Sequence, residues 1–237
     1  MILRMRPERI VTRDAGELAE RAADWIATAL VDAVARRGGC ALALTGGNTP
    51  RSVYRRLADW PGIPWHAVAV FFGDERAVPP DHRESNYRLA VETLLSRVAV
   101  PAGQIHRMAA ERTDRDQAAR EYEASLPDPL DLLLLGIGTD GHTASLFPHA
   151  ATLAERRRRV VPAFGGVPPK PRLTITPPVI AQARSLLLMA TGAEKAPAVA
   201  AALRAGASAE AVPARLAQHG AWILDRAAAA ELPEAAP

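Results

Sequence analysis

Apolar side chains recur along the chain in two different patterns. Between Asp14 and the glycines at residues 38–39 they return every three or four positions, as on one face of a helix. Asp14 followed by Glu17 is a capping-box-like helix start, and Gly38 is a typical stop. Short continuous apolar runs, typical of buried strands, follow at residues 40–45, 67–72, 130–136, 160–164, 173–176, 185–190 and 221–225.

These runs alternate with helical segments along most of the chain. Alternation of this kind predicts an α/β fold, a three-layer sandwich whose central sheet is mostly parallel and covered on both faces. No Ser/Pro-rich linker or internal repeat divides the sequence, so we expect one domain over residues 1–237, with a disordered tail at residues 231–237. Ligands of such sheets bind beyond the carboxyl ends of the strands, so we look for chemistry in the segment after each strand.

Composition and charge narrow the class of protein. The 237 residues are 49% hydrophobic and 23% charged, as in ordinary globular proteins, and the net charge is only +3. Basic residues are not clustered together with aromatic ones, which argues against a nucleic-acid partner. Four consecutive arginines at residues 156–159 form the one dense basic run, and we expect it to be a solvated helix end. No apolar run is long enough for a membrane helix and the N-terminus has no apolar secretory segment, so we expect a cytoplasmic protein without a membrane partner.

Cysteine and lysine are both scarce in this sequence. Cys40 is the single cysteine, which excludes an internal disulfide, and its place before an apolar run predicts an inert core thiol rather than a nucleophile. The chain lacks a ligand cluster at metal spacing, and we expect neither a metal nor a cofactor. The 29 basic residues are arginines except for Lys170 and Lys195, so a compact ammonium group at either position is of interest.

The strand at residues 40–45 runs into a glycine pair. Gly46 and Gly47 let the backbone approach a ligand closely, and Asn48 and Thr49 offer side-chain hydrogen bonds. A helix that we expect to open at Pro50 adds free amide groups and positive potential. The segment is therefore an expected anion cradle, although it lacks the spacing of a Walker loop. The alternative is a tight turn with a helix cap.

Three charged residues follow the strand at residues 67–72. Asp74, Glu75 and Arg76 are costly to hold near a core unless they pair or meet a polar ligand. We expect this segment to form part of a site, and the alternative is a charged surface turn. Further along, Ser85 is the expected N-cap of the next helix, and His82 is expected to be a solvated loop histidine.

The strand at residues 130–136 continues into the string GIGTDGHTASLFP at residues 136–148. Its glycines match the dinucleotide pattern G-x-G-x-x-G, but Pro148 follows soon after and no acidic residue stands about 20 positions on, so a nucleotide site is not indicated. The bare backbone instead lets Asp140 and His142 point into one cleft. Histidine titrates near neutrality, so His142 is a candidate general base, and the alternative is a core histidine.

Together these strings resemble one enzyme family. The segments at residues 45–50, 73–76, 85–87, 136–148, 171–174 and 192–195 look like those of the 6-phosphogluconolactonases of the pentose phosphate pathway, in the same order and over nearly the whole chain. The string DGHTASLFP is the specific part of the match. Asn48 departs from the Ser that is frequent in this family, which puts affinity rather than chemistry in question because both side chains donate hydrogen bonds.

The resemblance implies hydrolysis of 6-phospho-D-glucono-1,5-lactone to 6-phosphogluconate, on a fold shared with glucosamine-6-phosphate deaminase and ribose-5-phosphate isomerase. It implies that His142 is the general base that activates water and that Asp140 orients its ring. The stabiliser of the oxyanion is not readable from the sequence.

The resemblance also places Arg172 and Lys195 on the substrate phosphate, next to the glycine pair at residues 46–47. Without a ligand they would be an ordinary strand-edge charge and a helix-surface residue. Arg76 either contacts the substrate or pairs with Asp74, and Asp74 is either structural or substrate-orienting. We expect a small-molecule partner and a monomer or small homo-oligomer.

Two other functions stay open. The related deaminases carry a similar glycine-rich string but continue to Asn-Glu-Pro, whose Glu serves proton transfer, whereas this chain has Phe147 there. Absence of that acid favours ester hydrolysis, which does not require it. A non-catalytic sugar-phosphate sensor on the same fold would keep Arg172 and Lys195 but tolerate loss of His142.

Overall fold

A six-stranded parallel sheet forms the centre of the protein. The computed structural model describes residues 8–166 and 171–233, and the sheet has the order β1-β9-β8-β5-β2-β3. Its strands are β1 (Arg9–Thr12), β2 (Cys40–Leu44), β3 (Val68–Phe72), β5 (Leu132–Gly136), β8 (Ser185–Ala190) and β9 (Ala221–Asp225). Every pairing within it is parallel, which confirms the expected α/β class.

A second, three-stranded antiparallel sheet has the order β4-β7-β6. Its strands are β4 (Asp74–Arg76), β7 (Pro171–Ile175) and β6 (Val160–Phe164). The chain crosses between the sheets at Gly73, whose amide donates to Leu44 of β2 and whose carbonyl accepts from the amide of Ile175 in β7. The apolar pattern predicts β6 and β7 but not their separation from the parallel sheet, and it misses the short, charged β4.

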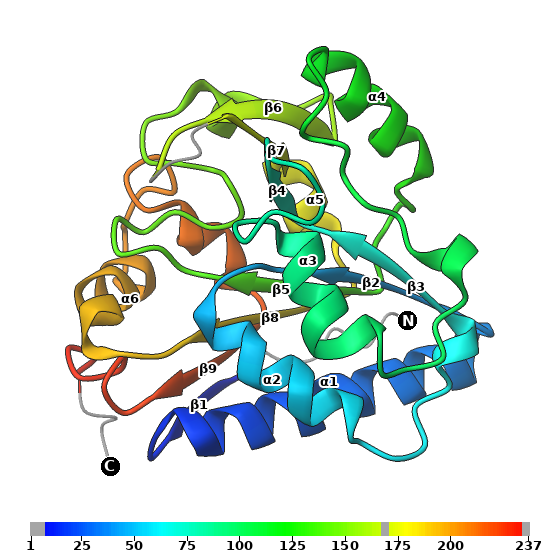
Figure 1. Ribbon diagram of the computed structural model, residues 1–237. Coiled ribbons are helices and arrows are strands. Elements are labelled where there is room, and N and C mark those ends of the chain that lie inside the picture. Colours follow the sequence, from blue (N-terminus) through cyan, green and yellow to red (C-terminus); the bar gives the residue numbers. More distant parts are fainter. Residues whose placement is uncertain (1–7, 167–170, 234–237) are drawn as a thin grey trace.

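Six α-helices are described. They are α1 (Ala15–Arg37), α2 (Asn48–Ala58), α3 (Asn86–Ala90), α4 (Arg115–Ser125), α5 (Pro177–Gln182) and α6 (Ala196–Leu203). Shorter helical turns are Trp65–Ala67, Val91–Leu95, Ala102–Gln104, Ala151–Ala154, Ala193–Lys195 and Pro213–Ala217. In Figure 1, α1 and α2 lie along one side of the parallel sheet, and β6, β7 and α4 lie on the other. No helix in this part of the chain is long and apolar enough to cross a membrane.

The first two helices test the expected boundaries. The Asp14 carboxylate caps α1 by accepting from the amide of Glu17, and Gly38 ends the helix in a left-handed conformation with φ 78°, as expected. The start of α2 differs from the prediction, because the helix begins at Asn48 and Pro50 is its third residue rather than its first. Gly47, with φ 107°, turns the chain straight into the helix, a conformation that glycine adopts without strain.

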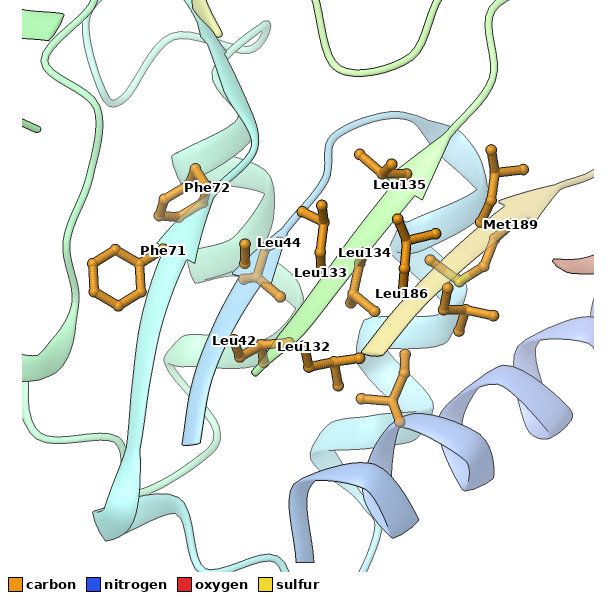
Figure 2. Close-up of a cluster of buried hydrophobic side chains, with 14 of the residues drawn as sticks. Leu42, Leu44, Phe71, Phe72, Leu132, Leu133, Leu134, Leu135, Leu186 and Met189 are labelled. Atoms are coloured by element: carbon orange, nitrogen blue, oxygen red, sulfur yellow. The ribbon is translucent and has the colours of Figure 1, made fainter. Parts of the chain in front are cut away.

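Leucines of the parallel strands form the core. Figure 2 shows Leu42 and Leu44 of β2 beside residues 132–135 of β5 and Leu186 of β8, with Phe71 and Phe72 of β3 at the edge of the group. All of them are buried, as expected where a parallel sheet is covered on both faces. Cys40 is buried at the start of β2, and burial raises the pKa of its thiol to about 12, which confirms an inert core thiol.

Two buried tyrosines fix the carboxyl ends of neighbouring strands. The Tyr54 hydroxyl donates to the carbonyl of Thr45 at 2.7 Å and accepts from its amide at 2.9 Å, just after β2. The Tyr122 hydroxyl makes the same pair of bonds with Phe72 at the end of β3. Each ring therefore satisfies both backbone groups of one residue where the sheet ladder stops.

One expectation is corrected. Residues 156–159 are not a solvated helix end, because Arg158 forms an ion pair with Asp116 of α4 at 2.5 Å and Arg159 donates to the Glu123 carbonyl at 2.6 Å. Their partners lie far away in sequence, which a local pattern does not show. The expected disordered tail at residues 231–237 lies outside the described residues from 234 on, whereas Leu232 packs against the core. Lys170 is also outside the described residues.

Candidate active site

A cavity of about 240 Å³ lies beyond the carboxyl ends of β2, β5 and β8, which are neighbours in the sheet. From β2 the chain proceeds to β3 on one side, and from β5 it proceeds to β8 and β9 on the other, so the cavity sits where the strand order reverses. Nine of the predicted site residues line it: Gly46, Gly47, Asn48, Thr49, Asp74, Arg76, His142, Arg172 and Lys195. Asp140 does not line the cavity but contacts His142.

The glycine segment after β2 is held from three sides. Tyr54 fixes Thr45, and the Thr49 hydroxyl lies 2.7 Å from that of Thr191 in the segment after β8. A Cβ at Gly46 would lie 1.8 Å from Oδ1 of Asn86, so only glycine leaves room for that side chain. No side chain caps the start of α2, which leaves its first amides as donors for a ligand in the cavity.

Strand β4 divides its charged side chains between two faces. Asp74 and Arg76 line the cavity, while Glu75 between them points the other way, as strand alternation requires. The Glu75 carboxylate accepts from the Ser85 hydroxyl and from the amides of Asn86 and Tyr87 at 2.8–3.0 Å. Burial raises the pKa of Glu75, and these backbone hydrogen bonds counter the effect. The segment is thus buried structure rather than a surface turn.

Asp74 is fixed in place. One of its carboxylate oxygens accepts from the Ser145 hydroxyl at 2.6 Å, and the other accepts from the side-chain amide of Asn86 at 3.0 Å. Ser85 caps α3 by accepting from the amide of Arg88, as expected, and so holds the helix that begins with Asn86. Ser145 and Asn86 hold Asp74 in position. Neither was predicted as a site residue, although both lie in segments that resemble the family, residues 136–148 and 85–87.

Three cations, Arg76, Arg172 and Lys195, line the cavity. Arg76 of β4 and Arg172 of β7 are directly opposite each other in the antiparallel register. Arg172 is 4% exposed, and its guanidinium lies 3.9 Å from the Asp74 carboxylate. Burial lowers the pKa of Arg172, which Asp74 partly offsets, although an arginine stays protonated at neutral pH. Like charges in register are unfavourable without a counter-charge, so the arrangement favours an anionic ligand.

The remaining cationic groups are also poised for a ligand. Arg76 donates to the Glu84 carbonyl at 2.5 Å, whereas its buried Nε has no hydrogen-bond partner among the described residues. Arg76 thus reaches the cavity rather than pairing with Asp74, a choice that the sequence left open. Lys195, at the end of the helical turn Ala193–Lys195, forms no ion pair with the described part of the chain.

The imidazole of His142 lies on the wall supplied by the segment after β5. Its Nδ1 is 2.5 Å from the Asp140 carboxylate, which also accepts from the His142 amide at 3.1 Å. Partial burial acts to raise the pKa of Asp140, but the hydrogen bond and charge of His142 outweigh it and the pKa is lowered. With Nδ1 engaged, Nε2 is the nitrogen left for a reacting proton. Within the described residues, no cluster of three or more His, Cys, Asp or Glu could hold a metal.

Two polar lining residues after β8 were not predicted. Glu194 brings a carboxylate to the cavity and Thr191 brings a hydroxyl. Thr191 follows β8 directly and Glu194 lies in the next helical turn, so their position after a strand was the available signal.

Comparison with known proteins decides the family. A family model described as glucosamine-6-phosphate isomerases/6-phosphogluconolactonase matches residues 13–224. The 6-phosphogluconolactonase of Synechocystis sp. is 39% identical over 228 residues, which is 91% of this chain and 94% of that protein. The chain belongs to the 6-phosphogluconolactonase family.

Solved structures agree with this assignment. The 6-phosphogluconolactonase of Trypanosoma brucei has a TM-score of 0.84 and 30% identity, covering 96% of this chain and 99% of that one. A monomeric glucosamine-6-phosphate deaminase of the NagB superfamily reaches a TM-score of 0.83, covering 94% of this chain and 99% of that one. At 23% identity it shows a shared fold alone. The fold expected from the resemblance to 6-phosphogluconolactonases is therefore confirmed.

The position of the imidazole depends on a glycine. A Cβ at Gly138 would lie 2.0 Å from Nδ1 of His142 and 2.5 Å from the Asp140 carboxylate. We expect Gly138→Ala to displace the ring and lower kcat about 100-fold, because misplacement by about 1 Å is costly in catalysis. Stability should change little, since a side chain moves rather than the backbone. Steady-state kinetics and thermal unfolding measure the two effects.

Gly73→Ala is the matched control. The nearest atom to its added Cβ is the Leu44 carbonyl oxygen at 3.7 Å, an ordinary contact. We expect kcat within about twofold of the wild type for this variant. Equal kcat values in the Gly138→Ala and wild-type proteins would contradict the placement of His142 in the reaction.

Proposed function

We propose that this protein hydrolyses 6-phospho-D-glucono-1,5-lactone to 6-phosphogluconate in the oxidative pentose phosphate pathway, with His142 as general base. One observation carries the assignment of roles. A single cavity is lined both by the imidazole that Asp140 holds and by Arg76, Arg172 and Lys195. A phosphorylated ring has the same two chemical ends, an ester carbonyl and a dianion.

The chemistry needs a base and a positioned water. A lactone is an activated ester, so water attack at C1 requires removal of one proton as the new C–O bond forms. Nε2 of His142 accepts that proton, and the Asp140 carboxylate stabilises the resulting imidazolium through Nδ1. Collapse of the tetrahedral intermediate breaks the bond from C1 to the ring oxygen, which takes the proton from the imidazolium and becomes the 5-hydroxyl. The open-chain carboxylic acid then releases its remaining proton to solvent and leaves as the carboxylate.

The phosphate is the expected anchor. Arg172 presents a planar fork to it, Lys195 a compact ammonium, and Arg76 a second guanidinium that lines the cavity. Backbone and side-chain donors of Gly46, Gly47, Asn48 and Thr49 complete the cradle. The fixed carboxylate of Asp74 holds the Arg172 guanidinium in place and does not itself bind the anion. Binding energy from this remote group then orients the ester against the base.

Hydrolysis also accounts for Phe147, which lies in the same segment as the proposed base. A deaminase requires a proton-transferring acid where this chain has Phe147, whose ring is buried.

We infer a reducing, cytoplasmic setting, since a lone buried thiol suits a reducing compartment. We also propose that the protein is a monomer or small homo-oligomer. A sensor without activity would show no turnover and would still bind the sugar phosphate after loss of His142.

Removal of the base tests the reaction. We expect His142→Ala to lower kcat about 100-fold or more on freshly generated lactone, with a small change in KM, because the lost group acts in proton transfer rather than binding. Coupled formation of 6-phosphogluconate measures both constants. The control is His149→Ala, a nearby exposed histidine beside Glu210, which should keep wild-type rates. A sensor would show no turnover in any of these proteins.

Removal of the phosphate anchor tests binding. We expect Arg172→Ala and Lys195→Ala each to raise KM by a factor equivalent to about 1–3 kcal/mol, because each removes a charged hydrogen-bond donor to the phosphate. Arg184→Ala is the control, since that side chain pairs with Asp131 at the amino end of the sheet. An unchanged KM in both anchor variants would show that the phosphate binds elsewhere.

A further inference from the structure

Phe147 touches both working ends of the site. Its ring centroid lies 4.8 Å from that of His142, with the planes tilted by 46°. The central carbon of the Arg172 guanidinium lies over the same ring, 5.6 Å from its centroid. Phe147 is 7% exposed and does not line the cavity, so its ring does not itself contact a ligand there.

The imidazole has few other constraints. Among the described residues, its one side-chain hydrogen bond is to Asp140, whose side chain is 47% exposed, and a single bond of this kind leaves the ring free to turn about it. Gly138 gives the ring space but does not restrain it. The Phe147 ring supplies the second contact that limits its orientation, since aromatic pairs have preferred geometries and close-packed rings do not move independently.

The guanidinium of Arg172 is restrained in the same way. Its Nε donates to the Gly165 carbonyl at 3.2 Å, and Gly165 and Gly166 pack so tightly on Phe147 that a Cβ at either would lie 2.7–2.8 Å from the ring. The ring therefore supports Arg172 twice, by direct cation–π contact and through the turn that accepts its hydrogen bond. A flexible aliphatic side chain provides neither.

We propose that Phe147 is a positioning residue that sets the general base and the phosphate-binding arginine relative to each other. The inference rests on the proposed function, because it assigns Phe147 to the roles of His142 and Arg172. Phe147 then has a role of its own, besides standing where the related deaminases have a glutamate. One rigid ring fixes the spacing between the proton acceptor and the anion anchor, which the length of the substrate must match.

The test is Phe147→Leu, measured for kcat and KM separately. We expect kcat to fall about tenfold through His142 and KM to rise about fivefold through Arg172. The control is Leu146→Ala, at a fully buried neighbour that has no aromatic ring to place against either group. This variant should have lower thermal stability but keep kcat and KM within about twofold of the wild type. If Phe147→Leu does not fold, Phe147→Met replaces it.

Double-mutant cycles separate positioning from general packing. In an Arg172→Ala background, Phe147→Leu should no longer raise KM but should still lower kcat; in a His142→Ala background, it should still raise KM but no longer lower kcat. Effects that persist unchanged in both backgrounds, or that Leu146→Ala reproduces, would overturn the proposal. An inactive wild-type protein would instead overturn the proposed function itself, so the two failures are distinguishable.

Discussion

Two arginines, one in β4 and one in β7, lie directly opposite each other, and the site depends on how their repulsion is balanced. Arg76 and Arg172 are in direct register, and Arg172 is almost fully buried. Asp74 offsets part of this charge, but its oxygens are held by Ser145 and Asn86 and so do not move onto the arginines. In the proposed function, a phosphate dianion supplies the remaining negative charge, and substrate binding completes an arrangement that the fold holds in advance.

The two sheets divide the work between them. The parallel sheet carries the base on the segment after β5 and the glycine cradle after β2, while the antiparallel sheet carries both arginines. Gly73 joins the sheets through hydrogen bonds to Leu44 and Ile175, so the anchor and the base belong to one connected scaffold. The two arginines lie on strands, whereas His142 lies in the irregular segment at residues 137–150, where the Gly138 amide donates to the His142 carbonyl.

The sequence predicted five of the six strands of the parallel sheet, and nine of its ten expected site residues line one cavity, because buried strands and glycine-rich turns have strong local patterns. It missed the short edge strand β1 and also β4, whose charged residues do not resemble a strand, and it placed the start of α2 at Pro50 rather than Asn48. It also left the partner of Arg76 open. That choice, like the bonds of Asp74 to Ser145 and Asn86, depends on contacts between distant segments, which no local pattern encodes. The same limit applies to the contact of Phe147 with Arg172.

The orientation of the bound ligand is the most direct test of the whole account. A crystal structure of the wild-type protein with 6-phosphogluconate should place the phosphate against Arg76, Arg172 and Lys195. Its C1 carboxylate should lie within hydrogen-bonding reach, about 3 Å, of Nε2 of His142. A ligand bound in the opposite direction, or with its phosphate outside this cationic wall, would contradict the account.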